Sequence, residues 1–347
     1  MTQTVPAASS DRAAPRLAVV MPCYNEQEAL PATAARMSEY LDDMIARGVV
    51  DEDSALYFVD DGSRDGTWGA IADLTRTRPR VRGIKLTRNF GHQGAVLAGM
   101  FEAADAADVV VTIDADLQDD ETCIEKMVAA YRSGAEIVYG VREDRTADTV
   151  FKRATAEGYY RILGWLGVNV VFNHADYRLM SRRAIDILGQ YRETNLFLRG
   201  IVPLIGLNSQ IVSYTRRERQ AGVSKYPLKK MLALAWQGVT SFSVMPLRLV
   251  AALGAIMALA SSAVGVWALG VRLLGTGAVP GWASTVIPMY FLGGIQLFFL
   301  GVLGEYLGKI YMEVKDRPRY LIDRRTWRDE RVPEARDASP VRPETRF

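Results

Sequence analysis

Two long stretches without charged residues, close to the C-terminus, constrain the fold more than any other feature. Leu249–Val271 and Trp282–Gly304 each hold 23 residues and no charge. A helix of roughly 20 apolar residues is long enough to cross the hydrocarbon core of a bilayer. Buried helices of a soluble domain are the alternative, but soluble helices of this length normally carry a polar face. The sequence therefore predicts two transmembrane helices within residues 248–308.

Basic residues on the outer flanks of these stretches predict the orientation of the chain. The connection between them, residues 272–281, holds a single charge. Because lysine and arginine concentrate on the cytosolic side, we expect both termini and the N-terminal domain in the cytosol, at the inner (plasma) membrane. Two spans give each chain a small footprint in the membrane, so we also expect a homo-oligomer. The flanking basic residues are Lys225, Lys229, Lys230, Arg248, Lys309, Lys315, Arg317 and Arg319.

Three further segments have compositions unlike that of a folded core. Residues 226–247 combine lysine with tryptophan and leucine, which is typical of helices that lie in the membrane surface. An amphipathic helix packed on the soluble domain is a compatible alternative. Residues 1–15 are polar and rich in alanine and proline, so we expect a disordered leader. Residues 309–347 are expected to form a basic cytosolic tail, solvated from about Asp323 onward.

Residues 16–225 alternate short apolar runs with helical patterns, which is typical of an α/β domain. Strands followed by helices predict a mostly parallel sheet covered on both faces. The sequence contains no glycine-rich phosphate-binding loop after the first strand, so any phosphate must be bound by other residues. The expected strands are Leu17–Met21, Leu56–Val59, Val81–Leu86, Val109–Ile113 and Ile137–Val141.

Polar residues cluster directly after three of these strands. The clusters are Pro22–Glu26, Asp60–Ser63 and Asp114–Gln118. Each cluster alone could serve as a turn or a helix cap. Parallel strands place their carboxyl ends on one edge of the sheet, however, and open α/β sheets bind ligands there. We therefore expect the three clusters to converge on one crevice.

The acidic pair Asp114 and Asp116 indicates the chemistry of that crevice. Carboxylate oxygens suit Mg²⁺ or Mn²⁺, and such a metal is commonly shared with the phosphates of a substrate. The alternative is a polar strand-to-helix turn in which Asp119 or Asp120 caps the next helix. The pair predicts a metal site that handles a diphosphate compound.

Four motifs in this order resemble those of family 2 glycosyltransferases. The resemblance is to the polyprenyl-phosphate sugar transferases, which include dolichol-phosphate mannose synthases and bactoprenol glucosyltransferases, and it covers roughly residues 16–322. The motifs are Asp-Asp-Gly-Ser-Arg-Asp-Gly-Thr at 60–67, Asp-Ala-Asp-Leu-Gln-Asp at 114–119, Arg-x-x-Arg-x-Ala-Gly-x-Ser-Lys-Tyr-Pro at 216–227 and Ser-Phe-Ser-x-x-Pro-Leu-Arg at 241–248.

The resemblance implies a GT-A fold, which is a nucleotide-sugar domain on a Rossmann-like sheet, and it assigns donor-site roles. Asp61 would contact the base or the ribose of the nucleotide. The residues implied to line the nucleotide site are Pro22, Tyr24 and Glu26, and those implied to hold Mg²⁺ or Mn²⁺ against the diphosphate are Asp114, Asp116 and Gln118.

The resemblance also implies an acceptor side. Arg142 matches an arginine near the acceptor phosphate, and Asp176 stands where other family 2 enzymes carry an acceptor-side carboxylate. Asp176 could transfer a proton, orient the acceptor site, or pair with Arg178 or Arg182. We expect His92 and His174 to be structural. The loop implied to close over both phosphates contains Arg216, Arg219, Ser224 and Lys225.

These features predict inverting transfer of one sugar from a nucleotide diphosphate sugar, with UDP-glucose favoured, to undecaprenyl or decaprenyl phosphate. The second pKa of a phosphate is near 6, so the acceptor is already an oxyanion at pH 7 and needs no strong base. The alternatives are a GDP-mannose-using synthase and a non-catalytic nucleotide-sugar-binding scaffold. A processive polysaccharide synthase or a lipid flippase would need more spans. The net charge of +2 gives no reason to expect a nucleic-acid partner.

Overall fold

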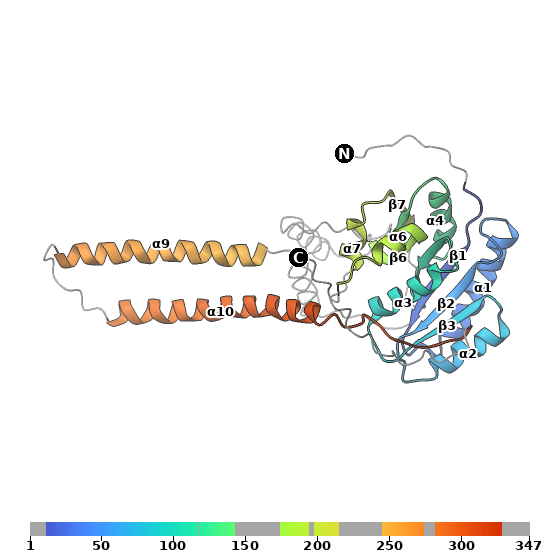
Figure 1. Cartoon of the computed structure of the whole chain (residues 1–347), viewed down its shortest axis with the longest axis horizontal. Coiled ribbons are helices and arrows are strands. Elements are labelled where there is room, and N and C mark those ends of the chain that lie inside the picture. The colour runs from blue at the N-terminus through green and yellow to red at the C-terminus, as the bar shows by residue number, and fades with distance from the viewer. Residues whose placement is uncertain are drawn as a thin grey trace, which may run out of the picture.

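The computed structural model describes residues 12–116, 118–142, 174–193, 198–214, 245–273 and 282–327. These residues form an α/β domain on one eight-stranded sheet, with two long helices that extend from it side by side (Figure 1). The strand order is β7-β5-β6-β4-β1-β2-β3-β8. The loop 216–225, the segment 226–244 and most of the leader lie outside the described residues.

Four parallel strands make up the centre of the sheet. Within this block β1 lies between β4 and β2, and β3 follows β2. All residues of β2 and β4 are buried, so these strands must be apolar along almost their whole length. This explains the continuous valine, leucine and phenylalanine runs of the sequence. The strands are β1 (Leu17–Cys23), β2 (Ala55–Asp60), β3 (Val81–Leu86) and β4 (Val109–Thr112).

The rest of the sheet mixes strand directions, which the sequence does not predict. Strand β6 runs antiparallel between β4 and β5, while β7 pairs parallel with β5. The predicted fifth strand therefore does not continue the parallel block but is separated from it by β6. These outer strands are β5 (Ile137–Arg142), β6 (His174–Ser181) and β7 (Ser209–Tyr214).

Helices cover both faces of the sheet, as predicted. Alternate residues of β1 point to opposite faces: Val19 and Met21 join one core, and Ala18 and Val20 join the other. The first core lies under α1 (Leu30–Ala46), α2 (Thr67–Thr77) and α4 (Cys123–Arg132). The second lies under α3 (His92–Ala104), α6 (Arg182–Leu188) and α7 (Leu198–Leu204).

Helix α3 packs unusually close to the sheet because a glycine faces β1. A Cβ added at Gly99 would clash with Val20 Cγ1 and would lie 2.8 Å from Val59 Cγ2. The backbone of α3 therefore approaches the sheet to a distance that no larger side chain allows. Since His92 begins α3, this contact also fixes the height of the helix N-terminus above the sheet.

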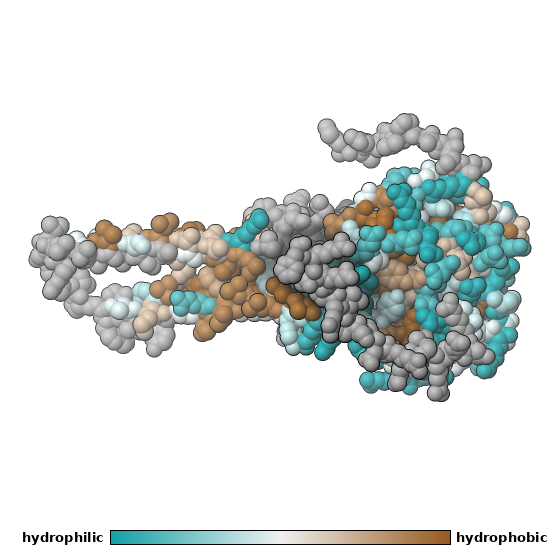
Figure 2. Space-filling view, in the orientation of Figure 1, coloured by the Kyte–Doolittle hydropathy of each residue, from teal (hydrophilic) through white to brown (hydrophobic). Residues whose placement is uncertain are grey.

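The two long helices coincide with the two predicted membrane stretches. They are α9 (Met245–Leu273) and α10 (Trp282–Val314). Within the described residues, one segment, Phe291–Val314, is long and apolar enough to cross a membrane, and α9 offers a shorter apolar stretch, Met245–Met257. Hydrophobic residues gather visibly on α10 (Figure 2). Two transmembrane helices therefore remain a prediction.

The start of the predicted solvated tail is ordered, contrary to expectation. Strand β8 (Ile322–Arg325) pairs antiparallel with β3 at the edge of the sheet. Tyr320, Ile322 and Trp327 pack against the core beneath α3. Three of the four residues of β8 are charged, so overall composition hides this half-buried edge strand.

Candidate active site

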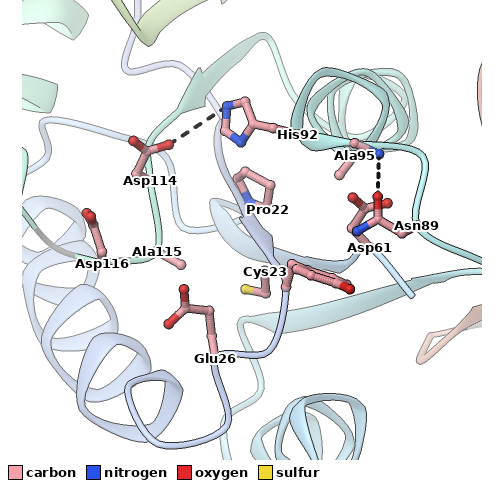
Figure 3. Close-up of a pocket in the computed structure, with 12 residues that line it drawn as sticks. Pro22, Cys23, Glu26, Asp61, Asn89, His92, Ala95, Asp114, Ala115 and Asp116 are labelled. Atoms are coloured by element: carbon pink, nitrogen blue, oxygen red, sulfur yellow. Dashed lines mark hydrogen bonds and ion pairs between the residues drawn. The ribbon is translucent and has the colours of Figure 1, made fainter. Parts of the chain in front are cut away.

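A pocket of about 350 Å³ opens at the carboxyl edge of the central strands. The three predicted clusters all contribute to it, so their convergence is confirmed. Figure 3 shows the carboxylates of Glu26, Asp114 and Asp116 on one side, with the side chains of Asp61 and Asn89 at the other end. The lining residues are Pro22, Cys23, Tyr24, Glu26, Asp61, Asn89, Gly91, His92, Ala95, Asp114, Ala115 and Asp116.

The turn after β1 is tied to the turn after β2. The backbone N–H of Asn25 donates to Ser63 Oγ at 3.0 Å, and the N–H of Glu26 donates to Thr67 Oγ1 at 2.9 Å. Burial, followed by the charges of Asp116 and Asp65, raises the pKa of Glu26. The first cluster therefore presents a carboxyl group toward the acidic pair, held by hydrogen bonds to Ser63 of the second cluster and to Thr67 at the start of α2.

The buried Asp61 links the end of β2 to the loop after β3. Its Oδ1 accepts a hydrogen bond from the N–H of Phe90 at 2.7 Å. Burial raises the pKa of Asp61, although amide hydrogen bonds from Phe90 and Gly91 oppose this shift. Gly62 has φ +65°, and a Cβ there would lie 2.5 Å from the backbone nitrogen of Asn89. Only glycine permits this approach of the two loops.

The acidic pair follows β4. Asp114 is partly buried, while Asp116 Oδ1 accepts the backbone N–H of Gln118 at 3.1 Å. Burial raises the pKa of Asp114, and the charges of Asp119, Asp116 and Asp176 raise it further against the lowering effect of His92. The pocket thus concentrates negative charge, which a divalent cation would relieve.

The donor set fits a metal that is completed by its substrate. No group of three or more histidine, cysteine, aspartate or glutamate residues is arranged to hold a metal in the described part of the chain. Mg²⁺ is often held by only one or two carboxylates together with substrate phosphates, and Asp114 and Asp116 supply that number. Gln118, the predicted third ligand, is not among the pocket-lining residues. Its structural contact to Asp116 is through the backbone.

Asp176 lies in a cluster of positive charge. Its carboxylate accepts a hydrogen bond from Arg178 Nη2 at 2.7 Å and lies 3.3 Å from Arg199 Nη2 and 3.4 Å from His92 Nε2. Burial alone would raise the pKa of Asp176, but these three partners outweigh it and hold the pKa well below its usual range. A general base needs a pKa nearer the working pH, so the low pKa of Asp176 argues against the predicted alternative of proton transfer.

The pairing of Asp176 with Arg178 is one of the predicted alternatives, and the pairing with Arg182 is not observed. Arg182 Nε instead donates to Asp186 at 2.9 Å. Arg178 is fully buried on β6, and its positive charge is compensated inside the domain by the carboxylate of Asp176. A buried charge of this kind needs such a partner.

His92, which we expect from the sequence to be structural, lines the pocket. Its Nε2 lies 3.9 Å from Asp114 Oδ1 (Figure 3). The same nitrogen lies 3.4 Å from Asp176 Oδ2, so His92 stands between the acidic pair and the Asp176 cluster. Burial lowers the pKa of His92, but the carboxylates of Asp176 and Asp114 raise it overall. The sequence does carry a signal for this position, because Asn89, Gly91 and His92 follow β3 at the same sheet edge as the other clusters.

Arg142 lies at the end of β5, beside the final aspartate of the Asp114–Asp119 motif. Its Nη2 is 3.6 Å from Asp119 Oδ1, and its Nε donates to Tyr214 Oη at 3.2 Å. Tyr214 in turn donates to Asp119 at 2.8 Å. Arg142 is not among the pocket-lining residues. The other predicted acceptor-side residues, Arg216, Arg219, Ser224 and Lys225, lie outside the described part of the chain, as does the side chain of His174.

Comparison with known proteins decides the family. The sequence pattern of Glycosyl transferase family 2 matches residues 18–189. The chain is 50% identical over 310 residues to the uncharacterized glycosyltransferase YkoT of Bacillus subtilis (strain 168), covering 89% of this chain and 91% of that protein. The chain belongs to glycosyltransferase family 2. This family 2 glycosyltransferase has the GT-A-type α/β fold that the resemblance implies.

Relatives of this glycosyltransferase include proteins with named substrates. The SfII prophage-derived bactoprenol glucosyl transferase of Shigella flexneri is 37% identical over 308 residues, which is 88% of this chain and 97% of that protein. Among solved structures, the mannosyltransferase PcManGT from Pyrobaculum calidifontis, in complex with GDP-Man and Mn²⁺, aligns with a TM-score of 0.40 at 16% identity, over 88% of this chain and 91% of that one.

Proposed function

We propose that this family 2 glycosyltransferase moves one sugar from a nucleotide diphosphate sugar to a polyprenyl phosphate at the cytosolic face of a membrane. The observation that carries the proposal is an acidic pocket at the strand ends of a domain joined directly to a long apolar helix, α10. The relative named for glucose transfer to bactoprenol supports a lipid phosphate acceptor and favours UDP-glucose as the donor.

In this proposal the donor occupies the pocket with its diphosphate toward the acidic pair. Pro22, Tyr24 and Glu26 line the nucleotide site, and Asp61 contacts the base or the ribose. Asp114 and Asp116 hold Mg²⁺ or Mn²⁺, with Gln118 as the remaining predicted ligand. When bound, the cation would neutralise the diphosphate leaving group, a contribution typical of metals in phosphate chemistry.

The acceptor needs positioning rather than deprotonation. A lipid phosphate is an oxyanion at pH 7, and the low pKa of Asp176 suits a group that orients its arginine and histidine neighbours. Arg142, Arg216, Arg219, Ser224 and Lys225 would surround the two phosphates and offset their repulsion. Attack from the face opposite the nucleotide would invert the anomeric centre.

A lipid-extraction assay tests this function. Membranes that contain the protein are incubated with labelled UDP-glucose or GDP-mannose, polyprenyl phosphate, and Mg²⁺ or Mn²⁺. We expect chloroform-soluble label from UDP-glucose. Label from GDP-mannose instead would support the mannose synthase, and the absence of label from both would leave the non-catalytic scaffold.

Replacement of Asp116 by asparagine tests the metal role within the same assay. An asparagine Oδ1 can still accept the N–H of Gln118, so the turn is kept while one negative charge is lost. We expect transfer to fall by on the order of 100-fold or more, because a charge-stabilising group is removed from the leaving group. Asp73→Asn, at an exposed position on α2, is the control. Full activity of Asp116→Asn would reject the metal assignment.

A further inference from the structure

The chain returns from α10 to the catalytic domain through residues Arg319–Trp327, which we call the C-terminal strap. Helix α10 ends at Val314, and Asp316 takes a left-handed φ of 45° where the chain changes direction. Figure 1 shows this segment in red, running from the end of α10 back across the domain to its β3 side. Only four residues separate the helix from the strap, so the two are mechanically connected.

Backbone and ring contacts fix the strap along the edge of the sheet. In β8, Arg325 pairs with Ile84 of β3, and the N–H of Thr326 donates to the carbonyl of Gly83 at 3.0 Å. Trp327 packs edge-to-face on Tyr57, with 5.5 Å between ring centroids. The strap is therefore an integral strand of the catalytic domain.

A sheltered ion pair joins the strap to α3. Arg325 donates from Nε and Nη2 to the two carboxylate oxygens of Glu102, at 2.5 and 2.6 Å. The two side chains are only 16% and 20% exposed. Bidentate arginine–carboxylate pairs are stronger and more directional than single surface ion pairs. Glu102 lies near the end of the same helix that begins with His92.

The strap also contacts the wall of the pocket from behind. The N–H of Thr87, in the loop after β3, donates to the carbonyl of Leu321 at 3.0 Å. The carbonyl oxygen of Arg319 would lie 3.5 Å from a Cβ placed at Gly94, in the first turn of α3. The wall formed by this loop and turn carries four pocket-lining residues: Asn89, Gly91, His92 and Ala95.

We propose that the strap positions this wall of the pocket relative to α10, and that Arg325 is a positioning residue for the nucleotide sugar. The strap is bonded to this wall at Thr87, passes close to it at Gly94, and is bonded to the far end of α3 at Glu102. Misplacing a binding group by about an ångström costs on the order of 100-fold in rate. The expected effect on the rate of sugar transfer rests on the proposed function. The expected effect on the position of the pocket wall does not.

The test uses the full chain in lipid nanodiscs with a charge exchange. Arg325→Glu repels Glu102, Glu102→Arg repels Arg325, and the double variant restores an ion pair with reversed polarity. Arg324→Glu is the matched control, since its side chain is 50% exposed on the same strand and Asp323 lies 3.6 Å away. Hydrogen exchange is followed at the amides of Thr87 and Phe90, together with KM and kcat for the nucleotide sugar.

We expect each single variant to speed exchange at both amides by on the order of tenfold and to raise KM more than it lowers kcat. The double variant should recover most of both losses, and the control should show neither. Phe90 reports the pocket because its N–H donates to Asp61. If Thr87 exchanges faster while Phe90 and KM are unchanged, the strap is only a structural strand and the proposal is wrong.

Failure of the proposed function and failure of the strap proposal give different results. If the native protein transfers no sugar, the proposed function fails, but exchange at Phe90 still decides whether the strap positions the pocket wall. Should Arg325→Glu not fold, Arg325→Gln removes the charge without repulsion and is judged by the same exchange criteria.

Discussion

At the scale of single residues, the pocket depends on loops that touch backbone to backbone. Gly62 lets the end of β2 meet Asn89, and the buried Asp61 accepts the amide of Phe90 across the same contact. The shape of this end of the pocket therefore depends on the backbone geometry of the two loops. Changes at Gly62 are expected to disturb binding and stability together.

Gly62→Ala tests this contact. Alanine at this position would have to adopt the left-handed backbone conformation, and its Cβ would lie 2.5 Å from the backbone nitrogen of Asn89. We therefore expect a loss of stability of about 2 kcal/mol or more. Gly48→Ala is the control, because Gly48 has φ +68° with nothing near its Cβ position, and should cost about 1 kcal/mol. Thermal unfolding and UDP binding are measured. Equal losses in the two variants would contradict the contact.

Glu136 makes stability depend on pH. It accepts hydrogen bonds from Ser181 at 2.5 Å and Arg12 at 2.8 Å, which outweigh burial and lower its pKa. A depressed folded-state pKa stabilises the protein above the unfolded value of about 4.3, and this contribution is lost as the pH falls through the folded value.

Glu136→Gln should remove that acid-sensitive contribution of about 1 kcal/mol. The variant is expected to be less stable than the native protein at pH 7 and to converge with it below about pH 4. The melting temperature is followed between pH 7 and pH 3. A constant difference across the whole range would show that Glu136 does not titrate in the way inferred.

At the scale of elements, α3 is the helix on which the pocket most depends. It begins with His92, carries Ala95 on the pocket wall, contacts β1 through Gly99, and holds Arg325 through Glu102. The helix is thus packed on the sheet and bonded to the strap, and its N-terminal turn lines the pocket.

Gly99→Ala tests the helix–sheet contact. A methyl group there would clash with Val20 and Val59, so we expect overpacking to cost about 1–3 kcal/mol and to displace His92. Gly69→Ala on α2 is the control: no atom lies near its Cβ position, and alanine should stabilise that helix by up to about 1 kcal/mol. Unfolding is measured by circular dichroism. Opposite signs for the two variants are expected, and a stabilised Gly99→Ala would contradict the close packing.

The sequence predicts the parallel block and its strand-end clusters well because β2 and β4 are buried throughout, leaving an unmistakable apolar pattern. Strand β6 is not predicted because the charged residues Asp176 and Arg178 interrupt its apolar pattern. In the folded domain the charges of these two residues compensate each other. The position of His92 in the pocket is not predicted because its partners, Asp114 and Asp176, are distant in sequence. Such pairings depend on tertiary contacts that no local pattern carries.

At the scale of the whole molecule, a catalytic domain is joined to helices that we expect to lie in a membrane. The two predicted spans would place residues 272–281 on the side opposite the domain. The native cysteines, Cys23 and Cys123, are both buried in the domain. A cysteine introduced between the spans can therefore be labelled against a low background.

Gly277→Cys should react with a membrane-impermeant maleimide added to intact cells, because two spans carry this position across the membrane. Labelling only after permeabilisation would place residue 277 in the cytosol and reject the two-span topology. Asp73→Cys, at an exposed position of α2, is the control and should react only in permeabilised cells.

The position of β8 in the sequence has a consequence for the order of assembly. Proteins are synthesised from the N-terminus, and N-terminal units generally fold first. The edge of β3 therefore stays unpaired during synthesis until both long helices have left the ribosome and β8 has followed them. An uncovered edge strand invites pairing with other chains. A fragment ending before α9 would expose that edge permanently, so the soluble domain expressed alone should aggregate, and nascent chains should be most vulnerable just before membrane integration is complete.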